Sequence, residues 1–191
     1  MHRWHFLPEG YLSRRSAAGY DRVIRNVYNA FSEHQVIREV VRRIRAFSPA
    51  SVLEVAPGPG RLMERLARLP SVTRLTGVEL SPYLLERAAS RISAGPARLV
   101  HGDGLALPLA EAEVDLATAS HYVGHLPATE RRRAVAEMAR VVRPGGHVVA
   151  VDHRWHPWPS VPSLREVDRS SCAFGAITLR VLERIESEAA A

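Results

Sequence analysis

Two acidic residues and a glycine turn mark the part of the sequence that is best suited to bind a small molecule. A short apolar run ends in the turn 56–60, which contains Gly58 and Gly60, and an amphipathic helical pattern follows directly. The next apolar run, residues 75–80, carries Glu79 near its end. In a β-α-β unit, such a turn presents backbone N–H groups at one strand end, and a carboxylate at the neighbouring strand end binds a ribose diol. The spacing therefore predicts a crevice for a nucleoside.

The glycine spacing excludes two common phosphate-binding signatures. A dinucleotide-binding turn needs a third glycine three residues after the second, and Met63 stands at that place. A P-loop needs a lysine after its last glycine, and the sequence contains no lysine. Taken alone, Gly58 and Gly60 are equally typical of an ordinary turn between a strand and a helix.

The segment 54–60, Glu-Val-Ala-Pro-Gly-Pro-Gly, resembles the first motif of the class I S-adenosylmethionine-dependent methyltransferases, in particular their small-molecule, methyltransferase-11-like core. This family usually has glycine where Ala56 stands, and we expect alanine to be tolerated there if its φ stays negative. The resemblance implies a set of cofactor-binding residues in this segment: Glu54, Ala56, Pro57, Gly58 and Gly60.

Two later segments resemble the second and third motifs of the same family. In the second, the resemblance implies that Glu79 binds both ribose hydroxyls and that Leu80 also contacts the cofactor. Ser81 is a suitable N-cap for the helix that follows. In the third, it implies that Asp103 accepts a hydrogen bond from the adenine amino group and that the Gly104 N–H reaches a ring nitrogen. Next come three leucines that either wall the adenine or pack in the core, with core packing expected for two of them: Leu105, Leu107 and Leu109.

The fourth segment, residues 113–126, resembles the family's central strand and the loop that carries much of its chemistry, with Ser120 as a cofactor contact. An apolar stripe predicts a helix over 128–142, which Arg-Pro-Gly-Gly at 143–146 ends, and a strand follows at 147–152. The resemblance covers residues 50–153. It implies an α/β, Rossmann-like doubly wound sheet, mostly parallel, with strand order 3-2-1-4-5 and a C-terminal hairpin that is either complete or shortened.

His121 and His125 are the candidate catalytic residues, because both follow the fourth strand, near which the family places the transferred methyl group. A neutral imidazole takes a proton from a phenol, an enol or an amine as the methyl group leaves sulfur. The alternative is that catalysis rests on proximity alone. The pairs His121/His125 and His153/His156 also have spacings that invite a metal, but no suitably spaced third ligand accompanies them, so we predict no metal site.

Residues 1–47 are expected to form an N-terminal helical cap, and residues 48–191 the cofactor-binding core with a short C-terminal extension. The segment around Tyr20 resembles the lid that precedes the core in small-molecule methyltransferases, which makes Tyr20 a further cofactor contact. Tyr11 and Tyr28 either close over the cofactor and substrate together with Tyr20 or are half-buried packing residues. Further along, an apolar stripe predicts a helix that packs on the sheet: Ile37, Val40, Val41 and Ile44.

The C-terminal segment departs from the family pattern. Three prolines between 157 and 162 predict a loop, and the apolar residues between 181 and 185 suggest a final helix. No clean pair of strands is evident, so we expect the sheet to stop at five or six strands. An uncovered edge of the fifth strand would then invite a homodimer or a partner subunit.

Composition narrows the class of protein. The formal net charge is +6 with a pI near 10.4, which hints at nucleic acid, but every side chain counted as basic is arginine and Arg131–Arg133 fit a solvated helix face. The segment 119–122 lacks the motifs of base-modifying methyltransferases, so nucleic acid is an unlikely partner. No apolar run could span a membrane. A single cysteine, Cys172, cannot form an internal disulfide, and a reducing cytoplasm is expected.

The sequence therefore predicts methyl transfer from S-adenosylmethionine to an O, N or C atom of a small-molecule acceptor. Two alternatives stay open. One is a catalytically silent methyltransferase-like subunit that supports an active partner, which Ala56 and the short C-terminal extension suggest. The other is an RNA methyltransferase that uses the positive charge of the protein.

Overall fold

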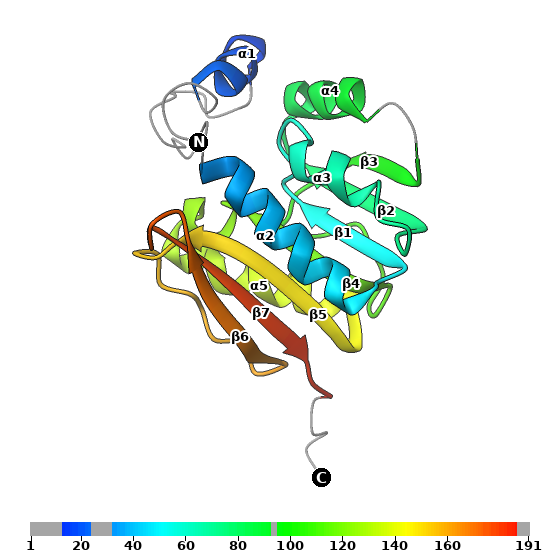
Figure 1. The fold of residues 1–191 in the computed structure, drawn as a ribbon, viewed down its shortest axis with the longest axis vertical. Coiled ribbons are helices and arrows are strands. Elements are labelled where there is room, and N and C mark those ends of the chain that lie inside the picture. Colours follow the sequence, from blue (N-terminus) through cyan, green and yellow to red (C-terminus); the bar gives the residue numbers. More distant parts are fainter. Residues whose placement is uncertain (1–12, 24–31, 93–94, 187–191) are drawn as a thin grey trace.

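The computed structural model describes residues 13–23, 32–92 and 95–186 (Figure 1). A seven-stranded sheet with strand order β3-β2-β1-β4-β5-β7-β6 forms its centre. Its strands are β1 (Ser51–Val55), β2 (Arg74–Glu79), β3 (Ala97–His101), β4 (Val114–Ser120), β5 (Val142–His153), β6 (Leu164–Cys172) and β7 (Ile177–Arg184). Its helices are α1 (Arg14–Val23), α2 (Ser32–Phe47), α3 (Arg61–Leu66), α4 (Pro82–Arg91) and α5 (Ala128–Val141), with a 3-10 turn at Val123–His125.

The first five strands are parallel and have the predicted order 3-2-1-4-5. In a doubly wound sheet, ligands bind beyond the carboxyl ends of the strands, at the point where the strand order reverses. Here this point lies between β1 and β4. Apart from Tyr20 of α1, the predicted site residues lie at or just after the carboxyl ends of β1, β2, β3 and β4, and the topology therefore brings them to one edge of the sheet.

Helices cover both faces of the sheet (Figure 1). On one face, α2 and α3 pack through Val40, Ile44 and Met63, each of which is completely buried. On the other face, α5 packs through Met138 and Val141, which are also completely buried. The predicted packing of the α2 stripe on the sheet is therefore confirmed.

Local signals place most element boundaries correctly. Strand β1 covers 51–55, and α4 begins at Pro82 after Ser81, whose hydroxyl accepts a hydrogen bond from the Leu84 N–H at 3.3 Å. The segment 143–146 was expected to be a turn before the strand, but β5 already begins at Val142 and pairs there with Val114. The left-handed Gly145, with φ 72°, lies inside this irregular strand start.

The expected final helix and the expected limit of five or six strands are both wrong. Residues 164–172 and 177–184 form an antiparallel hairpin, and the segment predicted as a final helix belongs to β7. The reason is a two-residue period: Ile177, Leu179 and Val181 are buried, whereas Thr178 and Arg180 between them are only partly buried. This alternation begins before the apolar group that suggested a helix. The prolines between 157 and 162 do lie in a loop, as predicted.

The hairpin also corrects the expected open edge of the fifth strand. Strand β7 pairs with β5 from His147↔Glu183 to His153↔Ile177, so no unpaired edge of β5 is left for a dimer or a partner subunit. The outer strand at this end of the sheet is β6 instead, and β3 is the outer strand at the other end. In the described part of the chain, no helix is both long enough and apolar enough to cross a membrane.

Candidate active site

The turn between β1 and α3 has an unusual backbone. Ala56, Gly58 and Gly60 all have positive φ values, of 54°, 55° and 79°. The condition under which alanine was expected to be tolerated, a negative φ, is therefore not met, and Ala56 adopts a left-handed conformation that costs about 1–2 kcal/mol for a residue with a Cβ atom. At Gly60, a Cβ would lie 3.0 Å from the Ala88 Cα, so glycine allows α3 and α4 to pack closely.

Glu79 at the end of β2 holds this turn through both carboxylate oxygens. Its Oε2 accepts a hydrogen bond from the Gly58 N–H at 2.9 Å, and its Oε1 accepts one from the Ser81 N–H at 2.9 Å. The side chain is 5% exposed, and burial raises its pKa although the backbone donors act in the opposite direction. Leu80, the next residue, is 45% exposed and presents an apolar side chain beside the carboxylate.

Glu54 on β1 is a second buried carboxylate, with 2% of its surface exposed. Its Oε2 has no hydrogen-bond partner among the described residues. Burial, and to a lesser degree the charge of Glu79, raise its pKa to about 8. An unsatisfied carboxylate beside another one is suited to a cation, and S-adenosylmethionine carries positive charge on its sulfonium and its ammonium group. The residues present therefore fit the cofactor that the sequence predicts.

Asp103 and Gly104 follow β3 in a tight turn, in which the Asp103 Oδ1 accepts a hydrogen bond from the Leu105 N–H at 2.9 Å. A side chain at Gly104 would collide with the Tyr122 hydroxyl and with Val55, so only glycine fits against these neighbours. The Tyr122 hydroxyl is buried and has no hydrogen-bond partner among the described residues, and burial raises its pKa. The sequence had not identified Tyr122.

His121 lies just after β4, where Ser120 ends the strand half-buried. It also has a positive φ, of 54°, and its N–H donates to the Val151 carbonyl at 2.7 Å. Burial, together with His153 and His156, lowers the pKa of His121 to about 4, which keeps the imidazole neutral at pH 7. Its Nδ1 has no hydrogen-bond partner among the described residues. The ring of His121 is therefore neutral and its Nδ1 has no described partner, but the lowered pKa makes it a weak base.

The end of β5 adds groups that the sequence had not assigned to the site. The ring centroids of His121 and His153 are 5.1 Å apart, and His153 stacks on Trp155 at 4.4 Å with a 12° angle between the rings. The Asp152 Oδ2 accepts a hydrogen bond from the Gly124 N–H at 2.7 Å, beside the predicted His125. Burial raises the pKa of Asp152 to about 6. An acid at the end of an apolar strand, as at Glu79, was the signal that could have identified Asp152.

The predicted cofactor residues that follow β1, β2, β3 and β4 thus lie along one edge of the sheet. Of the three leucines at 105, 107 and 109, two were expected in the core, and Leu107 is buried while Leu109 packs partly buried against the same cluster, as predicted. Tyr20 belongs to α1, but its side chain is outside the described part of the chain, as are Tyr11 and Tyr28 entirely. Within the described residues, no group of three or more His, Cys, Asp or Glu side chains is arranged to hold a metal ion.

Comparisons with known proteins agree with this geometry. The profile of a family described as "Methyltransferase domain" matches residues 53–150. An O-methyltransferase from Pyrenophora dematioidea is 28% identical over 165 residues, which are 78% of this chain and 61% of the relative. The demethylmenaquinone methyltransferase of Desulfitobacterium hafniense is 30% identical over 120 residues, which are 60% and 47%. The chain therefore spans less than two thirds of the length of either relative.

Solved structures share the fold. The N-methyltransferase NodS from Bradyrhizobium japonicum, in complex with S-adenosyl-L-homocysteine, superposes with a TM-score of 0.74 at 22% identity, covering 89% of this chain and 98% of NodS. A putative methyltransferase in complex with the Trm112 activator of Haloferax volcanii gives 0.71 at 15% identity, covering 97% and 100%. With a family profile that matches half of its length and this sheet order, the chain belongs to the class I S-adenosylmethionine-dependent methyltransferases.

Proposed function

We propose that this protein binds S-adenosylmethionine and transfers its methyl group to a small-molecule acceptor, at an O, N or C atom. The observation that carries the proposal is the pair of buried carboxylates, Glu54 and Glu79, beside the turn 56–60, in which three residues have a positive φ. Relatives named as O-methyltransferases and an N-methyltransferase of the same fold support small acceptors of more than one kind.

Different residues of the site would bind different parts of the cofactor. Glu79 accepts from the ribose hydroxyls, Asp103 accepts from the adenine amino group, and the Gly104 N–H donates to the ring. Glu54 faces the positive charge of the methionine end. When bound, S-adenosylmethionine supplies an electrophilic methyl group on a cationic sulfur. The segment 1–47, with Tyr20, is proposed to close over this site as a cap.

His121 is the proposed proton acceptor on the acceptor side. As the acceptor atom forms its bond to the methyl carbon, the carbon–sulfur bond breaks and its electron pair stays on sulfur. The acceptor atom loses its proton, which the neutral imidazole of His121 accepts. Asp152 holds the Gly124 N–H and so orients the turn that carries His125, the second candidate base. How much this proton transfer contributes to the rate depends on whether the acceptor is a carbon acid, an amine or a phenol.

The first test is calorimetric titration with S-adenosylmethionine and S-adenosylhomocysteine. We expect micromolar binding by the wild type and loss of more than about tenfold in affinity for Glu79→Ala, because the ribose hydroxyls lose a charged acceptor. Glu86→Ala is the matched control, since Glu86 is a 62% exposed glutamate on α4 whose described ion pair, with Arg14, lies at the surface. Its affinity should equal that of the wild type.

A radiolabelled methyl-transfer screen over phenols, amines and carbon acids then identifies the acceptor class. Failure of the wild type to bind either ligand would instead favour the silent-subunit alternative, for which the left-handed Ala56 is the remaining argument. Salt-sensitive retention on RNA would favour the RNA alternative. A cytoplasmic location is part of the proposal and rests on the single cysteine.

A further inference from the structure

The segment 105–113, here called the strap, connects the adenine-side turn to β4. It begins directly after Asp103 and Gly104, and it contains neither a helix nor a strand. Leu107 anchors it in the core with 5% exposure. An irregular segment of this kind needs partners for its backbone N–H and carbonyl groups, since no regular element satisfies them.

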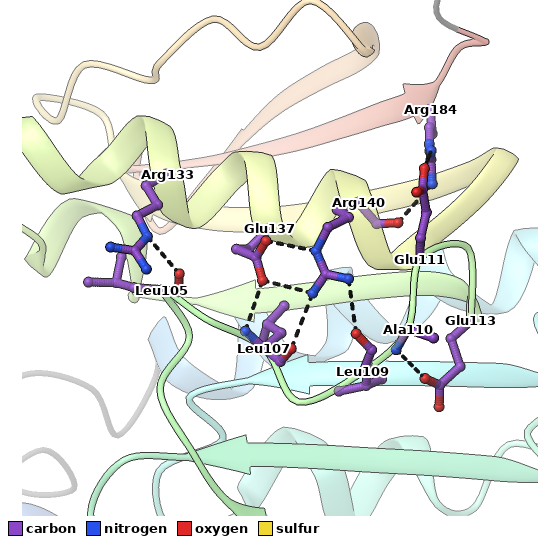
Figure 2. Close-up of polar contacts among 10 residues, drawn as sticks. All are labelled: Leu105, Leu107, Leu109, Ala110, Glu111, Glu113, Arg133, Glu137, Arg140 and Arg184. Carbon is purple, nitrogen blue, oxygen red and sulfur yellow. Dashed lines mark hydrogen bonds and ion pairs between the residues drawn. The ribbon is translucent and has the colours of Figure 1, made fainter.

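Two side chains of α5 supply three of these partners (Figure 2). The Glu137 Oε2 accepts a hydrogen bond from the Leu107 N–H at 2.9 Å. Arg140 donates to the Leu107 carbonyl at 3.1 Å and to the Leu109 carbonyl at 2.9 Å. Glu137 and Arg140 also bind each other through two hydrogen bonds, of 2.7 and 2.8 Å. The planar guanidinium thus joins one carboxylate and two backbone carbonyls, which a lysine could not do.

Glu137 and Arg140 are here called the clamp. Further contacts hold the strap at both of its ends (Figure 2). Arg133 donates to the Leu105 carbonyl at 2.9 Å, next to the adenine-side turn. Arg184, from the C-terminal hairpin, donates to the Arg140 carbonyl at 2.8 Å and to the Glu111 carboxylate at 2.7 Å. The hydrogen bonds with Arg140 hold the pKa of Glu137 below its usual value, so the pair stays ionised at neutral pH and its bonds are charge-assisted.

We propose that Glu137 and Arg140 are positioning residues for adenine recognition. By holding the strap on α5, they fix the direction in which the chain leaves Asp103 and Gly104, the two residues that contact the base. Neither side chain touches the adenine. Their removal therefore affects discrimination between bases more than the binding of the ribose and the methionine portion. The inference rests on the proposed function, because it assumes that this turn binds adenine.

The test compares two ligands that differ only in the part of the base that Asp103 and Gly104 are proposed to read. S-adenosylhomocysteine has the adenine amino group, whereas S-inosylhomocysteine has a carbonyl oxygen in its place and a proton on the adjacent ring nitrogen. We expect the wild type to prefer the amino compound by about tenfold or more, since the carbonyl cannot donate to Asp103 and leaves it unpaired. Arg140→Ala should reduce this ratio to about threefold or less, because the carboxylate of Asp103 is no longer held in the position that it needs to accept from the amino group.

Three further variants make the test specific. Arg140→Lys keeps the charge but cannot bind two carbonyls and a carboxylate together, so its ratio should fall between those of the wild type and Arg140→Ala. Glu137→Gln tests the second residue and should also reduce the ratio. Arg132→Ala is the matched control, because Arg132 is an exposed arginine of the same helix with no hydrogen bond or ion pair to the strap. Its ratio should equal that of the wild type.

Thermal melting of each variant separates positioning from stability. A lower melting temperature with an unchanged ligand ratio in Arg140→Ala and Arg140→Lys would show that the clamp only stabilises the fold, and it would overturn this inference alone. If the wild type binds neither compound, the proposed function falls and this inference with it. If Arg140→Ala does not fold, the ratios of Arg140→Lys and Glu137→Gln decide the question.

Discussion

The two buried carboxylates of the site differ in what holds them. Both oxygens of Glu79 accept backbone N–H groups, whereas the Oε2 of Glu54 has no hydrogen-bond partner among the described residues. Desolvation therefore dominates at Glu54, which is protonated below its pKa of about 8. A cation that binds beside it favours the charged carboxylate, so cofactor binding and proton release are coupled.

This coupling predicts a pH dependence of cofactor affinity. At pH 7, binding of S-adenosylmethionine should release up to one proton from Glu54, and affinity should rise from pH 6 to pH 8 as that proton becomes easier to remove. Calorimetry in phosphate and in Tris measures the release, because the two buffers differ in ionisation enthalpy. Glu54→Gln should give the same enthalpy in both buffers. Equal enthalpies for the wild type would contradict the prediction.

His121 combines a left-handed backbone with a neutral, buried ring. If it accepts the proton of the acceptor, His121→Asn should lower kcat by about 10²–10⁴-fold and change KM little. Because the pKa of His121 is about 4, its protonation should not reduce kcat between pH 7 and pH 5. Steady-state kinetics with the acceptor found in the screen measure both effects.

The matched control for this prediction is His147→Asn. His147 lies in β5 opposite Leu116, toward the other end of the sheet, where its ring stacks on Phe47. Its replacement should leave kcat near the wild-type value. A wild-type kcat in His121→Asn would mean that His125 takes the proton or that proximity alone suffices.

Among the secondary-structure elements, the C-terminal hairpin has the largest effect on the fold. Strand β7 covers the edge of β5 and places Leu179, which is completely buried, in the core opposite Val151. Arg184 of the same strand binds both the end of α5 and the strap. The hairpin therefore stabilises the sheet and also contributes to the clamp behind the adenine-side turn.

The burial of Leu179 predicts its contribution to stability. Leu179→Ala should reduce the free energy of unfolding by about 2–5 kcal/mol, because it removes apolar contacts and leaves a cavity in the core. Val167→Ala, at a 46% exposed residue of the neighbouring strand, should change it by about 0.5 kcal/mol or less. Urea unfolding followed by circular dichroism measures both values. Similar losses for the two variants would mean that the hairpin is not packed as the structure shows.

The whole chain has an outer sheet edge that discourages pairing. Strand β6 has a register shift between Glu166 and Asp168, and charged side chains interrupt its apolar residues. Several of these charges are paired within the molecule: Arg165 with Glu183, Arg180 with Glu166, and Arg43 of α2 with Asp168. Much of the arginine excess near this edge therefore serves the fold itself.

We expect a monomer at micromolar concentration for this reason. Sedimentation velocity should give one species near 21.2 kDa. A dimer would contradict this prediction, and substitution of both Arg165 and Arg169 by glutamate would test whether the dimer forms through β6. Such a variant should sediment as a monomer if the dimer forms there, since like charges would then face each other across the edge.

Local sequence determined the first half of the sheet and the position of the residues that are proposed to bind the cofactor. The residues of β1, the glycine turn, the acid of β2 and the cap of α4 are neighbours in the chain, so turn chemistry and apolar period alone place them. The parallel order 3-2-1-4-5 came from the family resemblance that these motifs carry.

The tertiary structure decided the rest. Strand β7 was missed because its partner, β5, is distant in sequence, and strand pairing shows only as a weak two-residue period in a segment with polar alternation. Asp152 reaches the Gly124 N–H, next to His125, only because β5 runs beside β4. Glu137 and Arg140 appear as an ordinary charged pair on a helix, three residues apart. Their side chains bind backbone groups of the strap only because the strap passes along α5. The path of the strap depends on tertiary packing, which the local sequence does not show.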